Sequence, residues 1–164
     1  MQLEIDIEDW PQGDWADLAE RASQATAQVA EELCNPRLLA SLLFTKDSRV
    51  HELNREWRGK DKSTNVLSFP MLERADLVHL DPDEGPPEML GDIALAHETC
   101  AREAADKGIA LADHAAHLIV HGLLHLAGYD HETSEADADA MERLEANALA
   151  ILGIANPYTA IDAE

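Results

Sequence analysis

The spacing of hydrophobic and polar residues in the first part of the chain predicts strands and helices in turn. Residues 3–7 alternate between apolar and acidic side chains, which predicts a first strand with one buried face. Over 14–33 the apolar residues recur at helical spacing, and Asn35-Pro36 supplies a stop signal. The short apolar run 38–45 predicts a second, buried strand.

A short helix, a strand and a loop are expected next. Ser48 is a candidate cap for a helix that runs to about Trp57, and Gly59 can end that helix because glycine adopts the left-handed conformation without strain. Residues 63–70 predict a strand closed by proline. Residues 73–90 carry many acids and three prolines, so we expect a long exposed loop there.

The remainder of the chain is dominated by predicted helices. Residues 91–96 predict a last strand, and helical spacing follows over 98–107, 111–127 and 134–152. The sequence contains no internal repeat and no sign of a second domain, so 1–164 is expected to form one domain. We therefore predict an α+β fold with a mixed sheet of about four strands packed against several helices.

The composition and the cysteine content indicate the cellular compartment and whether a membrane partner is expected. The apolar fraction is 46% but aromatic residues make up only 4%, so the core is expected to consist of Ala, Leu, Ile and Val. The N-terminus lacks the pattern of a signal peptide, and no apolar run is long enough to cross a bilayer. Cys34 and Cys100 form no close pair, which is typical of a reducing compartment. We expect a cytoplasmic protein without a membrane partner.

The net charge of −21 argues against nucleic-acid binding over the whole surface, because phosphate contacts require Lys and Arg. Six of the twelve basic residues nevertheless lie within 46–62, a segment that holds only four acids. These six residues are Lys46, Arg49, Arg55, Arg58, Lys60 and Lys62. The segment is either a solvated helix of mixed charge or a local patch that faces phosphate.

Three histidines point to a metal site at the end of a C-terminal helix. His121 and His125 are four residues apart, so on a helix they lie on the same face one turn apart. Gly128 can end that helix, which allows the chain to return His131 to the same point. Three imidazoles and one open position are typical of a catalytic zinc site, whereas a structural site would be filled by a fourth protein ligand. We predict one zinc ion per chain.

Neighbouring residues leave alternatives open. His114 and His117 fall on the same helical stripe as the predicted ligands, and His117 could replace or support one of them. Zinc peptidases carry a glutamate directly after the first histidine, where it activates water. Gly122 occupies that position here, which argues against a peptidase.

Four segments in order resemble one protein family. They are Leu53-Asn-Arg-Glu-Trp-Arg-Gly59, Thr64-Asn-Val-Leu-Ser-Phe-Pro70, Leu90-Gly-Asp-Ile93 and the histidine segment. Over about 38–153 the chain is similar to the YbeY family of bacterial single-strand-specific, metal-dependent endoribonucleases. Ser63 and Asn65 depart from the proline and aspartate that the family often has there.

The resemblance implies a function and a set of site residues. His121, His125 and His131 would bind zinc and Arg58 would take part in catalysis. The implied role is maturation of the 3′ end of 16S ribosomal RNA and late-stage ribosome quality control. The implied partners are single-stranded RNA, ribosomal RNA and the ribosome or proteins of its small subunit. On chemistry alone, Arg58 could bind a phosphate with two parallel hydrogen bonds, or could be an ordinary surface arginine.

Several roles and hypotheses stay open at this stage. Asp92 is either structural or a residue that orients the site, and Asp130 either anchors an imidazole N–H or caps the following helix. No general base stands out. Besides the endoribonuclease, the sequence allows a zinc-peptidase-like hydrolase and a non-enzymatic ribosome-assembly factor with a structural metal.

Overall fold

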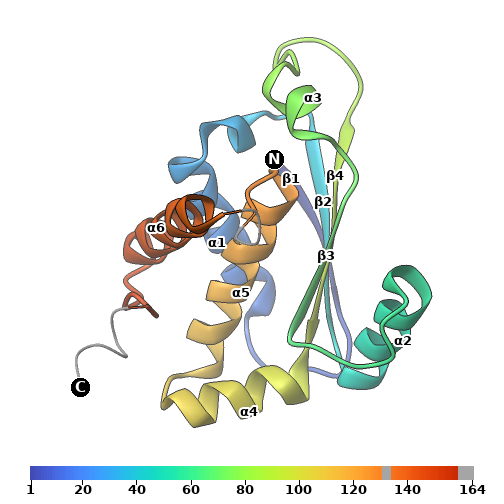
Figure 1. Ribbon diagram of the computed structural model, residues 1–164, viewed down its shortest axis with the longest axis vertical. Coiled ribbons are helices and arrows are strands. Elements are labelled where there is room, and N and C mark those ends of the chain that lie inside the picture. The colour runs from blue at the N-terminus through green and yellow to red at the C-terminus, as the bar shows by residue number, and fades with distance from the viewer. Residues whose placement is uncertain (131–133, 159–164) are drawn as a thin grey trace.

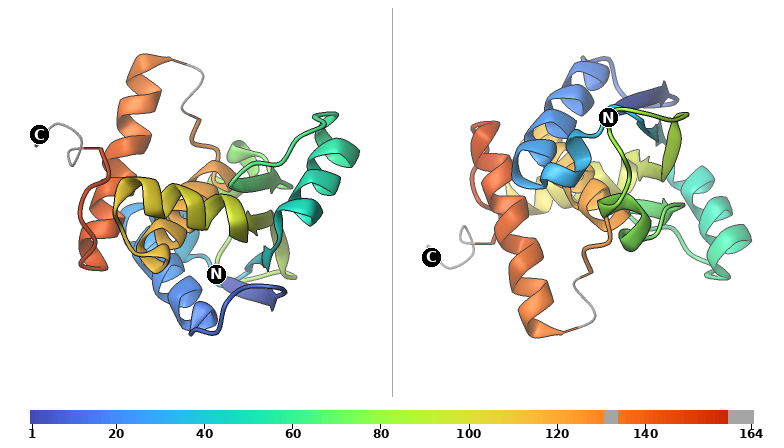
Figure 2. Two further views of the ribbon diagram at one scale, coloured as in Figure 1. Left: turned by 90° about the horizontal axis from the view of Figure 1, so that it is seen from below. Right: turned by 90° about the horizontal axis from the view of Figure 1, so that it is seen from above.

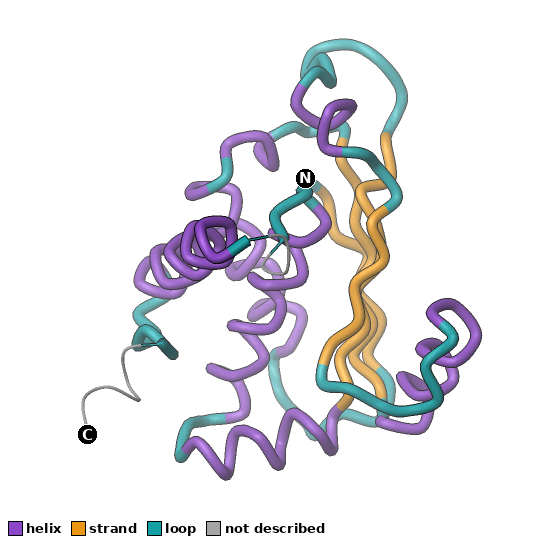
Figure 3. The backbone as a smooth tube through the Cα atoms, viewed as in Figure 1, coloured by secondary structure: helices purple, strands orange, loops and turns teal. Residues whose placement is uncertain are grey.

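Four strands form one mixed sheet in the computed structural model of the chain, which describes residues 1–130 and 134–158 (Figures 1 and 3). The strand order is β1-β2-β4-β3, and β1, β2 and β4 are parallel whereas β3 is antiparallel to β4. The strands are β1 (Gln2–Ile7), β2 (Leu38–Thr45), β3 (Val66–Pro70) and β4 (Glu88–Ala96). β1 and β3 are therefore the two edges of the sheet.

The helices are distributed unevenly over the two faces of the sheet (Figures 1 and 2). One face carries a helical layer built from α1 (Trp15–Val29), α5 (Leu111–Leu126) and α6 (Glu135–Ile151). The opposite face carries α2 (Asp47–Arg58) alone, packed on β3 and β4. The remaining helices are η1 (Glu31–Cys34), α3 (Arg74–Val78) and α4 (His97–Lys107). One side of the sheet thus carries a helical layer, and the other carries a single helix.

The main core lies between the sheet and the helical layer. In β2 the residues Leu38, Ala40, Leu42 and Phe44 are buried, and the side chains between them are less so, as alternation along a strand requires. α5 is the most buried helix, and small residues on α1 and α5 allow the two helices to pack closely. A second, small cluster under α2 consists of Val50, Leu67, Ala94 and Ala96.

The predicted α+β class and the four-stranded mixed sheet are confirmed, but two helix boundaries were wrong. The helix expected over 14–33 ends at Val29, because Ala30 is extended at φ −131° and the chain continues as the 3₁₀ helix η1. Ser48 does not cap α2, which begins one residue earlier at Asp47. The Asp47 carboxylate instead accepts hydrogen bonds from the backbone N–H and the hydroxyl of Thr99, at 3.1 and 2.7 Å. Gly59 ends α2 in the left-handed conformation as predicted.

The exposed loop expected over 73–90 was also wrong in part. The helix α3 forms within it and buries Leu77, and β4 begins at Glu88. The strand β1 forms where predicted, but its apolar face is only partly buried because it is an edge strand. Within the described residues, no single helix has the length and hydropathy to span a membrane; α4 and α5 pass such a test only as a pair, and the pair is bent by 114°.

Candidate active site

The helix α5 presents two of the predicted ligands on its exposed stripe. His121 and His125 are partly exposed, whereas most residues around them are buried. Between them, Gly122 faces β4, and a Cβ atom added to it would lie 3.0 Å from Cδ1 of Ile93. The glycine at this position therefore lets α5 pack closely on the sheet, and a larger side chain would require the Ile93 side chain to shift.

Each of these two histidines has its Nδ1 atom held by a side chain from another element. Nδ1 of His121 lies 3.1 Å from Oε1 of Glu145 on α6, and Nδ1 of His125 lies 2.6 Å from Oγ of Ser68 on β3. A hydrogen bond at Nδ1 fixes the orientation of the ring and leaves Nε2 as the coordinating atom, an arrangement found at many zinc sites. The donor chemistry of this pair therefore fits zinc.

Glu145 is a buried carboxylate with a relative exposure of 1% and several partners. Besides His121, it binds Nε2 of His117 at 2.9 Å and accepts from the Tyr158 hydroxyl at 3.0 Å. Burial raises the pKa of Glu145, but the hydrogen bonds and charges of His117 and His121 outweigh it and lower the pKa to about 2. His117 thus contacts the same carboxylate as the predicted ligand His121, and this contact is compatible with the supporting role that the sequence allowed.

The third predicted ligand, His131, lies outside the described residues. Within 1–130 and 134–158, no group of three His, Cys, Asp or Glu side chains is arranged to hold a metal ion. The three-ligand set therefore stays a prediction. The buried ring of His114 binds Oε1 of Glu103 on α4 at 2.8 Å and lies edge-on to the ring of His117, with ring centroids 6.4 Å apart.

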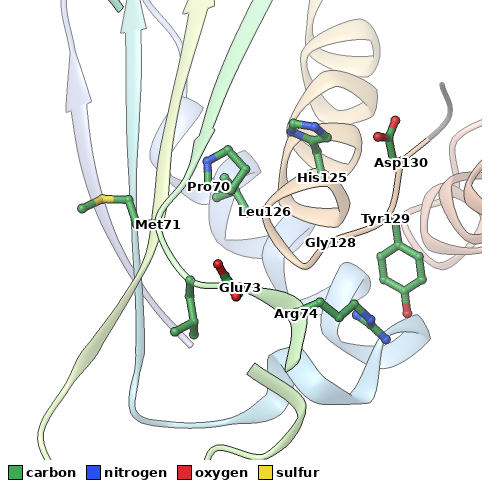
Figure 4. A pocket seen from close by; sticks show the side chains of 10 residues that line it. Pro70, Met71, Glu73, Arg74, His125, Leu126, Gly128, Tyr129 and Asp130 are labelled. Carbon is green, nitrogen blue, oxygen red and sulfur yellow. The ribbon is translucent and has the colours of Figure 1, made fainter. Parts of the chain in front are cut away.

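A cavity of about 530 Å³ opens beside His125, between α3 and the turn that follows α5 (Figure 4). Its lining comes from 70–74, from His125 and Leu126, and from 128–130. Asp130 is part of this wall, with its carboxylate near the end of α5 (Figure 4). Asp92 does not line this cavity. Its carboxylate accepts a hydrogen bond from Ser41 on the neighbouring strand, which favours a structural role over a role in orienting the site.

Arg74 holds the far wall of this cavity in place. Its guanidinium donates to the carbonyl oxygen of Ala127 at 2.7 Å, lies 2.6 Å from Oε2 of Glu32 and covers the ring of Tyr129. The Tyr129 hydroxyl also donates to Glu32, at 2.8 Å. Burial raises the pKa of Glu32, but hydrogen bonds from its own backbone, Tyr129 and Arg74 lower it below the usual value. The network ties α3 and η1 to the turn after α5.

The structure places Arg58 apart from these histidines. It is the last residue of α2, is exposed, and lies on the helix that packs against the opposite face of the sheet. It is not among the described residues that line the cavity beside His125. Its predicted contact with phosphate stays a prediction. Sequence reasoning missed the roles of Glu145, Ser68 and Arg74. Ser68 lies within the segment Thr64–Pro70 that resembles the family, but its contact with His125 depends on distant elements that meet in the fold.

Comparisons with known sequences identify one family, and a solved structure shares the fold. A family model described as Endoribonuclease YbeY matches residues 4–153. Relatives described as "Endoribonuclease YbeY" include one from Erythrobacter litoralis, 64% identical over 96% of this chain and 98% of its own, and one from Novosphingobium aromaticivorans, 57% identical over 98% and 97%. The solution structure of TM1509 from Thermotoga maritima is similar in fold, with a TM-score of 0.59 at 23% identity over 91% and 89% of the two chains.

Proposed function

The chain belongs to the endoribonuclease YbeY family, and from this premise we propose that it is a zinc-dependent endoribonuclease that cleaves single-stranded RNA. The observation that carries the zinc dependence is the pair His121–Glu145 and His125–Ser68, in which the Nδ1 atom of each ring is held from another element. The endoribonuclease activity itself is supported by the relatives that bear this name, because they match this chain over nearly their whole length.

In this proposal His121, His125 and His131 hold the metal, the first two through Nε2. Zinc bound there would supply a Lewis acid that lowers the pKa of water and polarises a phosphoryl oxygen. Glu145 and Ser68 hold the rings in one orientation, so little reorganisation accompanies binding. The cavity beside His125 gives a phosphodiester room to approach these ligands.

Arg58 would bind a phosphate of the substrate and offset the charge that develops during cleavage. Its exposure is compatible with this role, because its side chain is accessible to a ligand as large as RNA. The basic residues of 46–62 would contribute further phosphate contacts on an otherwise acidic molecule. The peptidase alternative stays disfavoured, because Gly122 stands where zinc peptidases carry the glutamate that activates water.

The proposed cellular role is maturation of ribosomal RNA at the 3′ end of the small-subunit species, together with late-stage ribosome quality control in the cytoplasm. Ribosomal RNA and the ribosome or its small-subunit proteins would then be the partners. The resemblance of the four sequence segments to the family supports this role.

Elemental analysis and a cleavage assay on one purified sample test the proposal. We expect about one zinc per chain and cleavage of a single-stranded RNA, with a duplex of the same sequence and casein left intact. Stripping the metal with a chelator should abolish cleavage while the circular dichroism spectrum stays folded. Unfolding on chelation would instead favour a structural metal. Casein hydrolysis without RNA cleavage would favour the peptidase.

A further inference from the structure

The sheet face that carries α2 holds a groove that the proposed chemistry does not use. The groove has a volume of about 500 Å³, within the range of small-ligand sites. Its apolar part is formed by α2 and the strands beside it, through Leu43, Leu53, Trp57, Phe69, Met71 and Ala94. We refer to it as the open-face groove.

Two large apolar side chains at this groove are exposed. Trp57 has a relative exposure of 72% and Met71 of 61%, whereas the other two tryptophans, Trp10 and Trp15, are buried in the main core. Neighbouring exposed apolar side chains that line one hollow mark interaction sites. An exposed indole is also the side chain best suited to stack on a planar ligand.

The groove is continuous with the candidate active site across the edge strand β3. Successive residues of a strand point to opposite faces, and here Ser68 binds His125 on one face while Phe69 lines the groove on the other. Met71, just beyond β3, lines both the groove and the cavity beside His125, and its side chain points away from His125 (Figure 4). A chain that crosses the end of β3 would therefore be in reach of both.

The charges around the groove distinguish a base from a phosphate. At its polar end Asp92 accepts a hydrogen bond from Ser41, and Asp6 lies nearby, so this end repels phosphate but can accept N–H groups of a base. Cationic side chains lie on α2 and just after it, with Arg49 lining the groove itself. Phosphates would follow this basic rim while a base occupies the apolar interior.

We propose that the open-face groove is a nucleobase subsite, in which Trp57 stacks on a base of single-stranded RNA. The neighbouring phosphodiester of the same strand lies across β3, at the cavity beside His125. That the ligand is RNA rests on the proposed function. The inference adds Trp57 as a residue that selects unpaired bases. A paired base cannot enter the groove without leaving its duplex.

Binding of a 2′-O-methyl RNA oligonucleotide to the intact protein tests the subsite without depending on cleavage. Trp57→Ala should weaken binding by roughly 5- to 100-fold, the loss expected when one base–aromatic stack is removed. Trp57→Phe should retain part of the affinity. The matched control is Ile151→Ala, another exposed apolar residue, on α6, which should bind as the wild type does. Tryptophan fluorescence should be quenched on binding in the wild type and not in Trp57→Phe.

An abasic oligonucleotide with the same backbone separates stacking from charge. The wild-type protein should bind the abasic oligonucleotide more weakly than the base-containing one. Trp57→Ala should bind the abasic oligonucleotide with the same affinity as the wild type. If the wild type and Trp57→Ala bind the base-containing oligonucleotide with equal affinity, the proposal of a nucleobase subsite is wrong. This result is expected if the groove binds a protein instead. If the wild type cleaves RNA and this equality is found, the subsite fails and the proposed function stands. If Trp57-dependent binding occurs but no RNA is cleaved, the subsite stands and the proposed function fails.

Discussion

Nδ1 of His121 on α5 lies 3.1 Å from Oε1 of Glu145 on α6, which places a buried carboxylate directly behind a predicted metal ligand. Glu145→Gln keeps the shape of the side chain but removes its negative charge. We expect zinc affinity to fall about 10- to 100-fold, as it does when such supporting partners are changed. Competition with a chromophoric chelator measures it. Tyr158→Phe is the control, because it removes a hydrogen bond to Glu145 but leaves the carboxylate and its charge in place; equal losses in the two variants would contradict a specific role of the Glu145 charge.

Gly128, in the turn after α5, should tolerate no larger residue. Its φ is +99°, and an added Cβ would lie 2.7 Å from Cδ and 2.9 Å from Cβ of Arg74. Gly128→Ala should lower the free energy of unfolding by about 2–4 kcal/mol, through backbone strain and overpacking together. Gly108→Ala is the matched control, since Gly108 also has a positive φ, +68°, but nothing within 4 Å of the added atom. Denaturant unfolding of both variants should show the larger loss at Gly128, and equal losses would remove the Arg74 contact from the explanation.

The sequence was most informative where one pattern lies within one element. The 3.6-residue spacing located α4, α5 and α6 to within a residue or two, because each helix buries one continuous stripe. It failed at Ala30 and within 73–90, where tertiary packing of Leu33 and Leu77 decides the local structure and no periodic pattern is long enough to show it.

Of the candidate site, the sequence predicted the placement of two histidines on one helix face but not the side chains that contact them. The i, i+4 spacing placed His121 and His125 on one face, and the helix α5 confirms that placement. The partners that orient them could not be found in the same way. Glu145 is one of many acids in an acidic helix, and Ser68 becomes important only because the edge strand β3 packs beside α5. Contacts across 24 and 57 residues depend on topology, which spacing along the chain does not encode.

Acid should destabilise the protein through His114 and Glu103. Burial lowers the pKa of His114, and Lys107 and His117 lower it further, while its partner Glu103 opposes the shift. The folded pKa is thus below the unfolded one, so stability is lost as pH falls from about 6.5 through the folded pKa. Burial raises the pKa of Glu103, but hydrogen bonds from His114 and Asn65 bring it below its usual value, so its contribution is also lost on acidification.

Melting temperatures between pH 7.5 and pH 5 measure this dependence. His114→Gln can still reach Glu103 but does not titrate, so its melting temperature should fall less over this range than that of the wild type. His79→Gln, at an exposed histidine, is the control and should follow the wild type. A His114→Gln profile as steep as the wild-type profile would show that other groups cause the acid sensitivity.

Arg58→Ala should separate phosphate binding from metal binding. Because Arg58 is exposed at the end of α2, its replacement should leave zinc content and melting temperature unchanged. Loss of a phosphate contact in the transition state should cost roughly 2–4 kcal/mol in kcat/KM, and Arg58→Lys should recover only part of it. Arg21→Ala, at an exposed arginine on α1, should cleave normally. Wild-type rates in a zinc-loaded Arg58→Ala sample would remove this residue from the active site.

The central claim is that RNA cleavage depends on a metal held by His121 and His125. The most direct measurement is the rate of single-stranded RNA cleavage by one protein sample as purified, after chelation and dialysis, and after one equivalent of zinc is returned. His121→Ala is carried through the same steps. We expect the wild type to lose cleavage on chelation and regain it with zinc, and His121→Ala to remain inactive throughout while staying folded. Undiminished cleavage by metal-free wild type, or zinc-dependent cleavage by His121→Ala at the wild-type rate, would contradict the account.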